Sequence, residues 1–139
     1  MNDEDLAKRL VHGVRRVAVL GIKTEAQRGQ PAYDVPAYLS SVGIEVVPVP
    51  VYYPEVTTIL GQTVYRRLVD IPGALDLVVI FRRPADVAAH VPDLLAKHPA
   101  AAWLQLGIRD DASAATLRAA GIEVVQDRCI LVDHRRWVA

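Results

Sequence analysis

The sequence has a single cysteine, Cys129, so no disulfide bond can form within the chain. An excess of charge is missing as well, because 16 Lys and Arg residues balance 16 Asp and Glu residues. A chain without net charge has no overall field that would draw it to nucleic acid or to an anionic membrane. We therefore expect neither of these partners, and any anion must bind at a local site.

Long hydrophobic runs are also absent. The apolar run at residues 77–81 is far shorter than the roughly 18 residues that span a membrane. The first residues are acidic, whereas a secretory signal has basic residues followed by an apolar stretch, so we expect a cytoplasmic protein. A length of 139 residues fits a single domain, residues 1–139.

Apolar segments with the length of strands alternate with segments of helical periodicity. This alternation is typical of a parallel sheet that is covered by helices on both faces. The predicted strands are residues 14–20, 44–49, 77–81, 101–106 and 123–126. The predicted helices are residues 35–42 with Asp34 as the cap, residues 87–95 with a bend at Pro92, residues 112–120 after the start signal Asp110-Asp111, and a short helix near residues 65–69. These elements predict an α/β fold with a mostly parallel sheet of five to six strands and the first strand at its centre.

The loop after the first predicted strand is the first place to look for a ligand. In an open parallel sheet, ligands bind at the carboxyl ends of the strands, where the strand order reverses. Residues 21–33 contain the cations Lys23 and Arg28, a hydroxyl group and two glycines, and they precede a helix whose first N–H groups favour an anion. This pattern fits both a phosphate site and a solvated loop. It contains neither the G-x-G-x-x-G fingerprint of dinucleotide sites nor the G-x-x-x-x-G-K-[ST] loop of nucleoside triphosphatases.

Several short blocks occur in a specific order along the chain. They read Pro-Ala-Tyr at residues 31–33, Val-Val-Pro-Val at residues 46–49, Phe-Arg-Arg-Pro at residues 81–84, Trp-Leu-Gln-Leu-Gly at residues 103–107 and Asp-Arg-Cys at residues 127–129. With this order, residues 12–136 resemble the stand-alone CoA-binding domain proteins, which are similar to the amino-terminal domain of the succinyl-CoA synthetase alpha subunit. The resemblance implies a Rossmann-like, doubly wound sheet with helices on both faces. It also implies coenzyme A or an acyl-CoA as the bound cofactor, with its diphosphate against the first loop.

By position, the resemblance implies a set of contact residues along the carboxyl edge of the sheet. The start of the first loop would contact the phosphates, residues 81–84 would line the adenosine side, and Cys129 would lie near the pantetheine end. The turn at Pro50 and Val51 would also be near the ligand, although it lacks the Asn that relatives tend to have there. The implied contact residues are Gly21, Ile22, Lys23, Thr24, Arg28, Tyr33, Pro50, Val51, Phe81, Arg82, Arg83, Leu104, Gln105, Leu106, Gly107 and Cys129.

These residues also have structural interpretations. The cations of the first loop could simply be solvated, and Arg82 and Arg83 could pair with Asp86. Cys129 could be a small buried hydrophobe. Trp103 is expected in the core, because it falls within a predicted buried strand and its indole ring has a large apolar area.

The sequence indicates binding and gives no sign of catalysis. No Ser-His-Asp, Cys-His or close carboxylate arrangement stands out, and the four histidines lack metal-ligand spacing. We therefore expect a module that binds a small-molecule ligand, without a metal and without catalysis of its own. Two alternatives remain: an NAD-binding Rossmann oxidoreductase or redox-sensing domain, and a regulatory subunit of an acyl-CoA enzyme. The missing glycine fingerprint and the lack of an acidic residue at residues 48–53 disfavour NAD.

Overall fold

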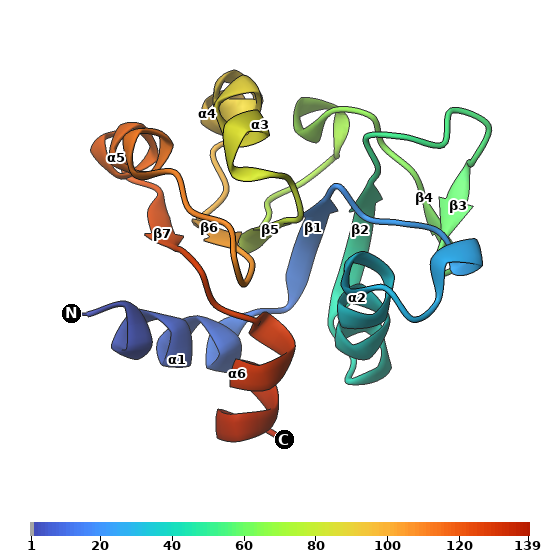
Figure 1. The fold of residues 1–139 in the computed structure, drawn as a ribbon, viewed down its shortest axis with the longest axis horizontal. Coiled ribbons are helices and arrows are strands. Elements are labelled where there is room, and N and C mark those ends of the chain that lie inside the picture. Colours follow the sequence, from blue (N-terminus) through green and yellow to red (C-terminus); the bar gives the residue numbers. More distant parts are fainter. Residues whose placement is uncertain (1) are drawn as a thin grey trace.

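The computed structural model describes residues 2–139 and contains a five-stranded parallel sheet (Figure 1). Every strand pairing in this sheet is parallel. Across the sheet, the strands follow the order β2 (Glu45–Val49), β1 (Arg16–Leu20), β5 (Leu77–Ile80), β6 (Ala101–Leu104) and β7 (Glu123–Val125). A separate antiparallel pair, β3 (Thr58–Ile59) and β4 (Gln62–Thr63), lies beside β2. The predicted α/β fold with a mostly parallel sheet is confirmed.

The strand order places β1 inside the sheet but not at its centre. β1 pairs with β2 on one side and with β5 on the other, and β5 is the middle strand. The chain runs from β1 to β2 at one edge and then returns to β5 on the opposite side of β1, so the strand order reverses between β1 and β5. The carboxyl ends of these two strands therefore flank the point at which parallel α/β sheets bind ligands.

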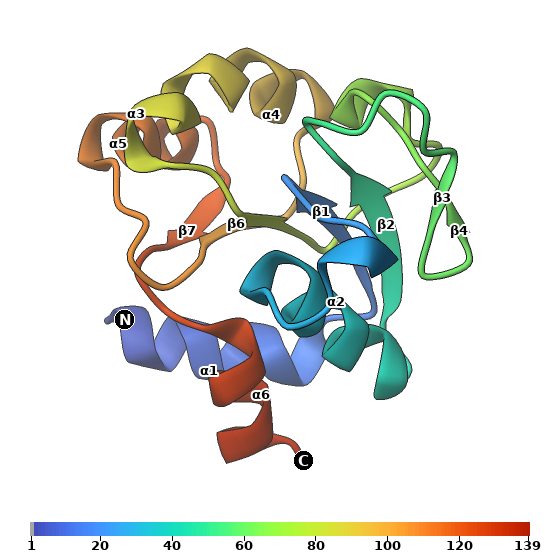
Figure 2. The same cartoon turned by 45° about the vertical axis from the view of Figure 1, so that its right-hand side comes forward.

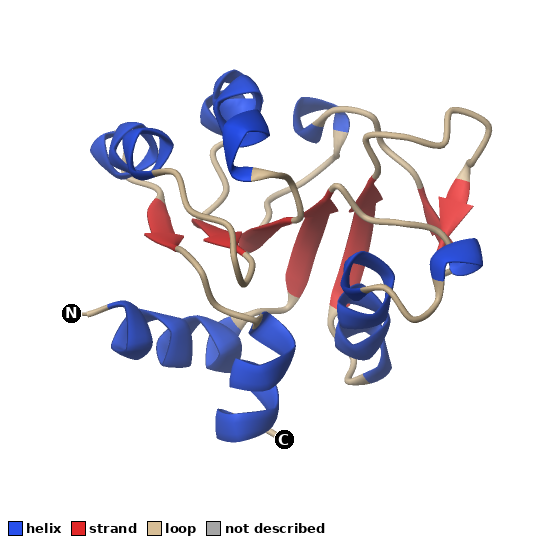
Figure 3. Ribbon diagram, viewed as in Figure 1, coloured by secondary structure: helices blue, strands red, loops and turns tan. Residues whose placement is uncertain are grey.

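Helices cover both faces of the sheet (Figure 2 and Figure 3). Side chains alternate between the faces along each strand, so Val17 and Val19 pack in one core cluster while Ala18 and Leu20 pack in the other. The first cluster is covered by α1 (Asp3–Gly13), α2 (Pro31–Ser41) and α6 (Ile130–Trp137). The second cluster is covered by α3 (Pro84–Val87), α4 (Val91–Lys97), α5 (Asp111–Ala119) and the 3₁₀ helix η2 (Leu68–Asp70), and a further 3₁₀ helix, η3 (Ala88–His90), joins α3 to α4.

Helix α2 begins at Pro31, four residues earlier than predicted, and Asp34 is not its cap. Proline suits the first turn of a helix, because the N–H groups of that turn have no intrahelical acceptor. Asp34 lies inside the helix, and its carboxylate accepts a hydrogen bond of 2.9 Å from the N–H of Gly29. The acidic side chain therefore fixes the preceding loop to the helix.

A second proline, Pro36, lies inside α2 and ties the helix to the loop after β1. Because Pro36 has no N–H, the carbonyl group of Ala32 receives no hydrogen bond from within the helix. That carbonyl accepts the N–H of Lys23 instead, at 3.0 Å. The loop and the first turn of the helix are therefore held together by their main chains.

The helix predicted over residues 87–95 is divided into α3, η3 and α4. Pro92 lies in the first turn of α4 and does not bend a continuous helix. Because Pro92 cannot donate an N–H, the chain before it tightens into the 3₁₀ turn η3. The short helix predicted near residues 65–69 is found at η2, because the N–H of Tyr65 donates to the carbonyl of Pro48 at 3.0 Å and keeps Tyr65 beside β2.

Two further helices, α1 and α6, are missing from the sequence prediction, and they pack against each other. The start of α1 is marked by Asn2, whose side chain accepts the N–H of Asp5 at 2.8 Å. The start of α6 depends on a distant residue, because the buried amide of Gln105 accepts the N–H of Ile130 at 2.9 Å. Within residues 2–139, no helix is long and apolar enough to cross a membrane.

Gly21 lies where the strand order reverses. Its backbone angle φ is +86°, and its N–H donates to the carbonyl of Val49 at 2.8 Å. A Cβ atom on Gly21 would lie 2.1 Å from the carbonyl oxygen of Phe81. Only a residue without a side chain allows the ends of β1 and β5 to approach each other so closely.

We expect the Gly21→Ala variant to lose about 3 kcal/mol or more of its free energy of unfolding, because it combines an unfavourable φ with a steric clash. Gly29→Ala is the matched control: Gly29 has a φ of +96°, but no atom lies within 4 Å of the position that a Cβ would take. The control should lose only about 1–2 kcal/mol. Urea unfolding measures the free energy of unfolding of both variants. Equal losses would show that the clash with the carbonyl of Phe81 does not destabilise Gly21→Ala.

Candidate ligand-binding site

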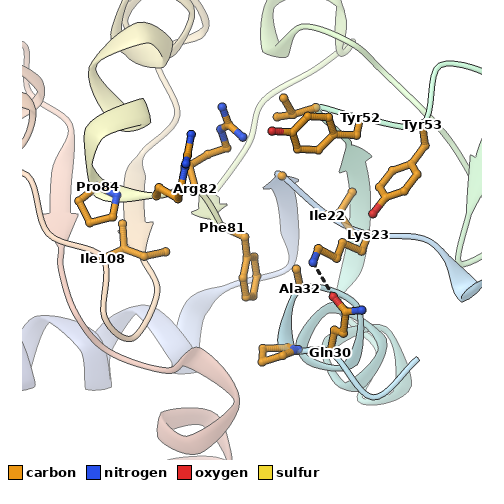
Figure 4. Close-up of a pocket in the computed structure, with 14 residues that line it drawn as sticks. Ile22, Lys23, Gln30, Ala32, Tyr52, Tyr53, Phe81, Arg82, Pro84 and Ile108 are labelled. Atoms are coloured by element: carbon orange, nitrogen blue, oxygen red, sulfur yellow. Dashed lines mark hydrogen bonds between the residues drawn. The ribbon is translucent and has the colours of Figure 1, made fainter. Parts of the chain in front are cut away.

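A cleft of about 630 Å³ lies over the carboxyl ends of β1, β2 and β5, where the strand order reverses. This volume is within the usual range of small-molecule sites. Its walls are formed by the loops after these strands, by the start of α2 and by one residue after β6 (Figure 4). The lining residues are Gly21, Ile22, Lys23, Gln30, Pro31, Ala32, Val51, Tyr52, Tyr53, Phe81, Arg82, Arg83, Pro84 and Ile108.

One corner of the cleft combines the loop after β1 with the first turn of α2. The ammonium group of Lys23 is hydrogen-bonded there to Oε1 of Gln30 (Figure 4). Among residues 2–139, no group accepts the backbone N–H of Ile22 or of Ala32, and both residues line the cleft. Backbone N–H groups without an acceptor and ammonium groups are the kinds of donor that bind anions such as phosphate. We call Ile22, Lys23 and Ala32 the Lys23 corner.

A second cationic group follows β5. Arg82 and Arg83 both line the cleft, and both pair with Asp86, at 3.7 Å and 2.9 Å respectively. Nε of Arg82 also donates to Nε2 of His90 at 3.1 Å. The two interpretations of these arginines, ligand contact and pairing with Asp86, are therefore compatible. We call Arg82 and Arg83 the arginine pair.

The charges around the arginine pair leave it cationic. The hydrogen bond from Arg83 lowers the pKa of Asp86 and raises the pKa of Arg83. Burial lowers the pKa of His90, and the charge of Arg82 lowers it further. His90 is therefore neutral near pH 7 and presents the lone pair of Nε2 to Arg82. In the described part of the chain, no three His, Cys, Asp or Glu side chains come together as metal ligands would.

Two tyrosines on the loop after β2 form part of the rim (Figure 4). Tyr52 is 62% exposed, and the guanidinium carbon of Arg82 lies 5.9 Å from the centroid of its ring. Tyr53 has a φ of +64°, a left-handed conformation that costs free energy in a residue with a side chain. Arg66 stabilises this conformation, because its guanidinium group donates to the carbonyls of Tyr52 at 3.0 Å, Tyr53 at 2.8 Å and Val56 at 2.9 Å.

The structure brings many of the predicted contact residues together in the cleft and leaves others outside its lining. Pro50 is buried and lies outside the lining, whereas its neighbour Val51 reaches the cleft. The predicted residues that line the cleft are Gly21, Ile22, Lys23, Val51, Phe81, Arg82 and Arg83.

Three predicted residues of the first loop, Thr24, Arg28 and Tyr33, lie outside the lining. The hydroxyl of Thr24 caps the 3₁₀ helix η1 (Glu25–Gln27) by accepting the N–H of Ala26 at 3.3 Å, and it donates to Oε1 of Gln27 at 2.7 Å. The guanidinium carbon of Arg28 lies 5.9 Å from the centroid of the Tyr33 ring, and Tyr33 is itself packed in the core. These residues shape the loop, and their contact with a ligand stays a prediction.

The predicted residues near β6 and α6 also lie outside the lining. Leu104 is buried in the second core cluster, and the amide of Gln105 is used to hold the start of α6. Leu106 is 69% exposed, and Gly107 turns the chain with a φ of +83°. Cys129 is partly buried directly before α6 and packs against the first core cluster. Contacts from these residues to a ligand likewise stay predictions.

The cleft contains several residues that the sequence patterns miss. Gln30 and Ala32 reach it because α2 begins at Pro31, so recognising the Gln-Pro pair as a helix start would have indicated them. Tyr52 and Tyr53 carry a weaker signal, an aromatic pair directly after a strand. Ile108 arrives from the loop after β6, and no local pattern marks it.

A family model of the CoA binding domain matches residues 15–135, and the chain belongs to this family. The protein YneT of Bacillus subtilis (strain 168) is 27% identical over 127 residues, which cover 91% of this chain and 90% of YneT. The structure of cell-free ID.343 from Thermus thermophilus is 35% identical with a TM-score of 0.86, and 99% of each chain is covered. The dinucleotide-forming acetyl-coenzyme A synthetase 1 of Ca. Korarchaeum cryptofilum is 16% identical with a TM-score of 0.63, over 78% of this chain and 25% of the synthetase. This last likeness extends to the fold alone.

Replacing Arg66 with Ala removes three hydrogen bonds to the loop after β2. We expect the amide of Val56, which donates to the carbonyl of Tyr53 at 3.1 Å, to exchange with deuterium at least about tenfold faster in this variant. Arg67→Ala is the matched control, because Arg67 is adjacent and exposed, and its side chain has no hydrogen bond or ion pair within residues 2–139. Unchanged exchange of the Val56 amide in Arg66→Ala, measured by NMR, would contradict the role of Arg66.

The lowered pKa of His90 predicts a loss of stability in acid. The folded protein takes up this proton less readily than the unfolded chain, whose histidine has a pKa of about 6.5. The contribution of His90 to stability is therefore complete above that pH and is lost as the pH falls from 6.5 through the lowered folded-state pKa. We expect His90→Asn, which keeps an acceptor for Arg82, to lose less stability than the parent protein between pH 7.5 and pH 5.5 in urea unfolding.

His134 serves as an internal reference in the same experiment. Its pKa is also lowered by burial, with a smaller effect of His12, so it continues to titrate in the His90→Asn variant. The variant should therefore retain part of the acid dependence. An NMR titration that gives His90 a pKa of 6.5 or above in the folded protein would refute the prediction.

Proposed function

We propose that the chain binds coenzyme A or an acyl-CoA in the cleft, with the diphosphate at the Lys23 corner. The observation that carries the proposal is the combination of two available N–H groups, on Ile22 and Ala32, with the ammonium group of Lys23 at the strand reversal of a CoA-binding domain. A diphosphate offers several acceptor oxygens within the span of such a corner. The N-terminus of α2 adds a favourable dipole, and the ammonium group adds a charge-assisted hydrogen bond.

The apolar side of the cleft suits the pantetheine arm of the ligand. Phe81 after β5, Pro84 at the start of α3 and Ile108 after β6 line the cleft there (Figure 4). The pantetheine arm is a flexible chain in which methylene and methyl groups alternate with amides. An apolar wall with few polar groups supports the binding of such a chain, because most small-molecule sites are built in this way.

We also propose that the chain acts by binding alone. The cationic side chains on the lining already have polar partners, because Lys23 bonds to Gln30 and the arginine pair bonds to Asp86. Ammonium and guanidinium groups in such pairs hold anions, whereas acid–base catalysis needs a group that changes its charge near neutral pH. This chemistry supports a protein that holds CoA without transforming it.

NAD is the competing ligand for a fold of this class. NAD sites use an acidic residue after the second strand to bind the ribose hydroxyl groups. In this chain β2 is followed on the cleft by Val51, Tyr52 and Tyr53, and the lining contains three cations and no carboxylate among the described residues. These groups favour a ligand that carries more negative charge than NAD.

Isothermal titration calorimetry with CoA tests the proposal. We expect Lys23→Ala to weaken CoA binding by about tenfold or more, because a charge-assisted hydrogen bond to phosphate is lost. Arg28→Ala, whose side chain lies over Tyr33 outside the lining, tests how far the phosphate site extends along the loop. If NAD binds and CoA does not, the proposed function is wrong.

A further inference from the structure

Helix α6 carries a buried histidine at the point where it meets α1 and α2. His134 is 6% exposed, and α6 packs against both of these helices. The hydroxyl oxygen of Tyr38, on α2, lies 2.8 Å from Nδ1 of His134, and the two rings meet edge to face with 5.5 Å between their centroids. This hydrogen bond links α6 to α2, and we call Tyr38 and His134 the latch.

The charged groups around the latch are cations. Burial lowers the pKa of His134, and the charge of His12 on α1 lowers it further. On α6, the guanidinium carbon of Arg135 lies 5.7 Å from the centroid of the Tyr38 ring. Among residues 2–139, no carboxylate forms an ion pair with His134. A proton on His134 would therefore add a buried positive charge that no negative charge balances.

The two halves of α6 are held by different groups. In the first half, Asp133 is 4% exposed and accepts two hydrogen bonds from Arg128, at 2.7 Å and 3.0 Å. The second half begins at His134, whose carbonyl accepts the N–H groups of Val138 at 2.8 Å and Ala139 at 3.1 Å. We call residues 134–139 the C-terminal turn, and in Figure 1 and Figure 2 it projects below α1. The buried ion pair thus holds the start of α6, and the latch holds the beginning of the C-terminal turn.

The other contacts of the C-terminal turn are more exposed. Arg136 pairs with Glu4 of α1 at 3.4 Å, but the two side chains are 60% and 51% exposed, and exposed ion pairs contribute little to stability. Trp137 is partly buried, and the guanidinium carbons of Arg128 and Arg136 lie 5.6 Å and 5.0 Å from the centroid of its ring. The exposure of this indole ring therefore reports whether the turn is docked.

We propose that Tyr38 and His134 form an acid-sensitive latch, which holds the C-terminal turn against α2 at neutral pH and releases it when His134 takes up a proton. The neutral imidazole accepts the hydroxyl proton of Tyr38 at Nδ1. Both nitrogens of the protonated ring are donors, so this bond is lost, and release of the turn lets the charged ring reach water. The latch goes beyond ligand binding, because neither of its residues lines the cleft.

The latch weakens over a defined range of pH. In the released turn the histidine is exposed and has a pKa of about 6.5, whereas in the docked turn the pKa of His134 is lower. Docking is therefore at full strength above pH 6.5 and weakens as the pH falls from 6.5 through the lowered pKa. Within this range, a fall of one pH unit changes the ratio of docked to released turns by at most about tenfold.

Acrylamide quenching of tryptophan fluorescence tests the latch. Trp137 is one of two tryptophans, and the other, Trp103, is 0% exposed in the core, so added quenching comes from Trp137. We expect the quenching constant of the parent protein to rise by about twofold or more between pH 7.5 and pH 5.5. Circular dichroism at both pH values checks that the sheet stays folded.

Two histidine variants show which group is responsible. His134→Asn keeps an acceptor for the Tyr38 hydroxyl and cannot take up a proton, so its quenching should not depend on pH. His98→Asn is the matched control, because His98 is exposed and its ring bonds to the carbonyl of Ala120 at 2.8 Å, outside the latch. This control should show the same rise in acid as the parent protein.

Tyr38→Phe separates the hydrogen bond from simple packing. The ring and its contacts remain, but the neutral form of His134 loses its hydrogen bond, so the pKa of His134 should rise towards 6.5 in an NMR titration. A pKa of His134 that does not change in this variant would show that the bond does not control the proton.

Three further outcomes would overturn the proposal. They are equal quenching of the parent protein at pH 7.5 and pH 5.5, an undiminished rise in His134→Asn, and loss of the rise in His98→Asn. If His134→Asn does not fold, the NMR titration of the parent protein still decides, because a pKa of 6.5 or above for His134 would exclude release by this proton.

Discussion

The close approach of β1 and β5 at Gly21 determines where the loops after these strands begin, and so the position of the cleft that they line. The carbonyl oxygen of Phe81 occupies the space that a side chain at Gly21 would need. The loops that follow these two strands therefore leave the sheet from adjacent points. Lys23 and Arg82 are far apart in the sequence, yet both line the same cleft because of this contact. A fold that buries its strands for stability thus also brings Lys23, Arg82 and Arg83 to one edge of the sheet.

Pro36 contributes to the Lys23 corner because it cannot donate a hydrogen bond within α2. Pro36 leaves the carbonyl of Ala32 without a partner in the helix, and the N–H of Lys23 takes that place. The N–H of the same residue, Ala32, has no acceptor among residues 2–139, and Ala32 lines the cleft. The carbonyl of Ala32 therefore holds the loop after β1 against α2. This bond fixes the N–H groups of Ile22 and Ala32 relative to each other.

The sequence predicts what depends on local pattern and misses what depends on distant contacts. The strands are visible because buried parallel strands are apolar on both faces. The start of α6 is missed because it is held by the amide of Gln105, a distant contact that the local pattern does not contain. In the candidate site, Lys23 is indicated by its loop and by the family resemblance. The conformation of Tyr53 is set by Arg66, thirteen residues further along the chain, and no local signal predicts it.

The contact of Arg66 with three carbonyl groups has a thermodynamic consequence for recognition. A loop that became ordered only around a ligand would subtract its conformational entropy from the affinity, roughly 1–2 kcal/mol for each residue that is fixed. Arg66 fixes the loop after β2 as the chain folds, so this cost belongs to the free energy of folding. Every candidate ligand then binds against the same conformation of this loop. A ligand of the wrong shape cannot gain affinity by changing the conformation of the loop.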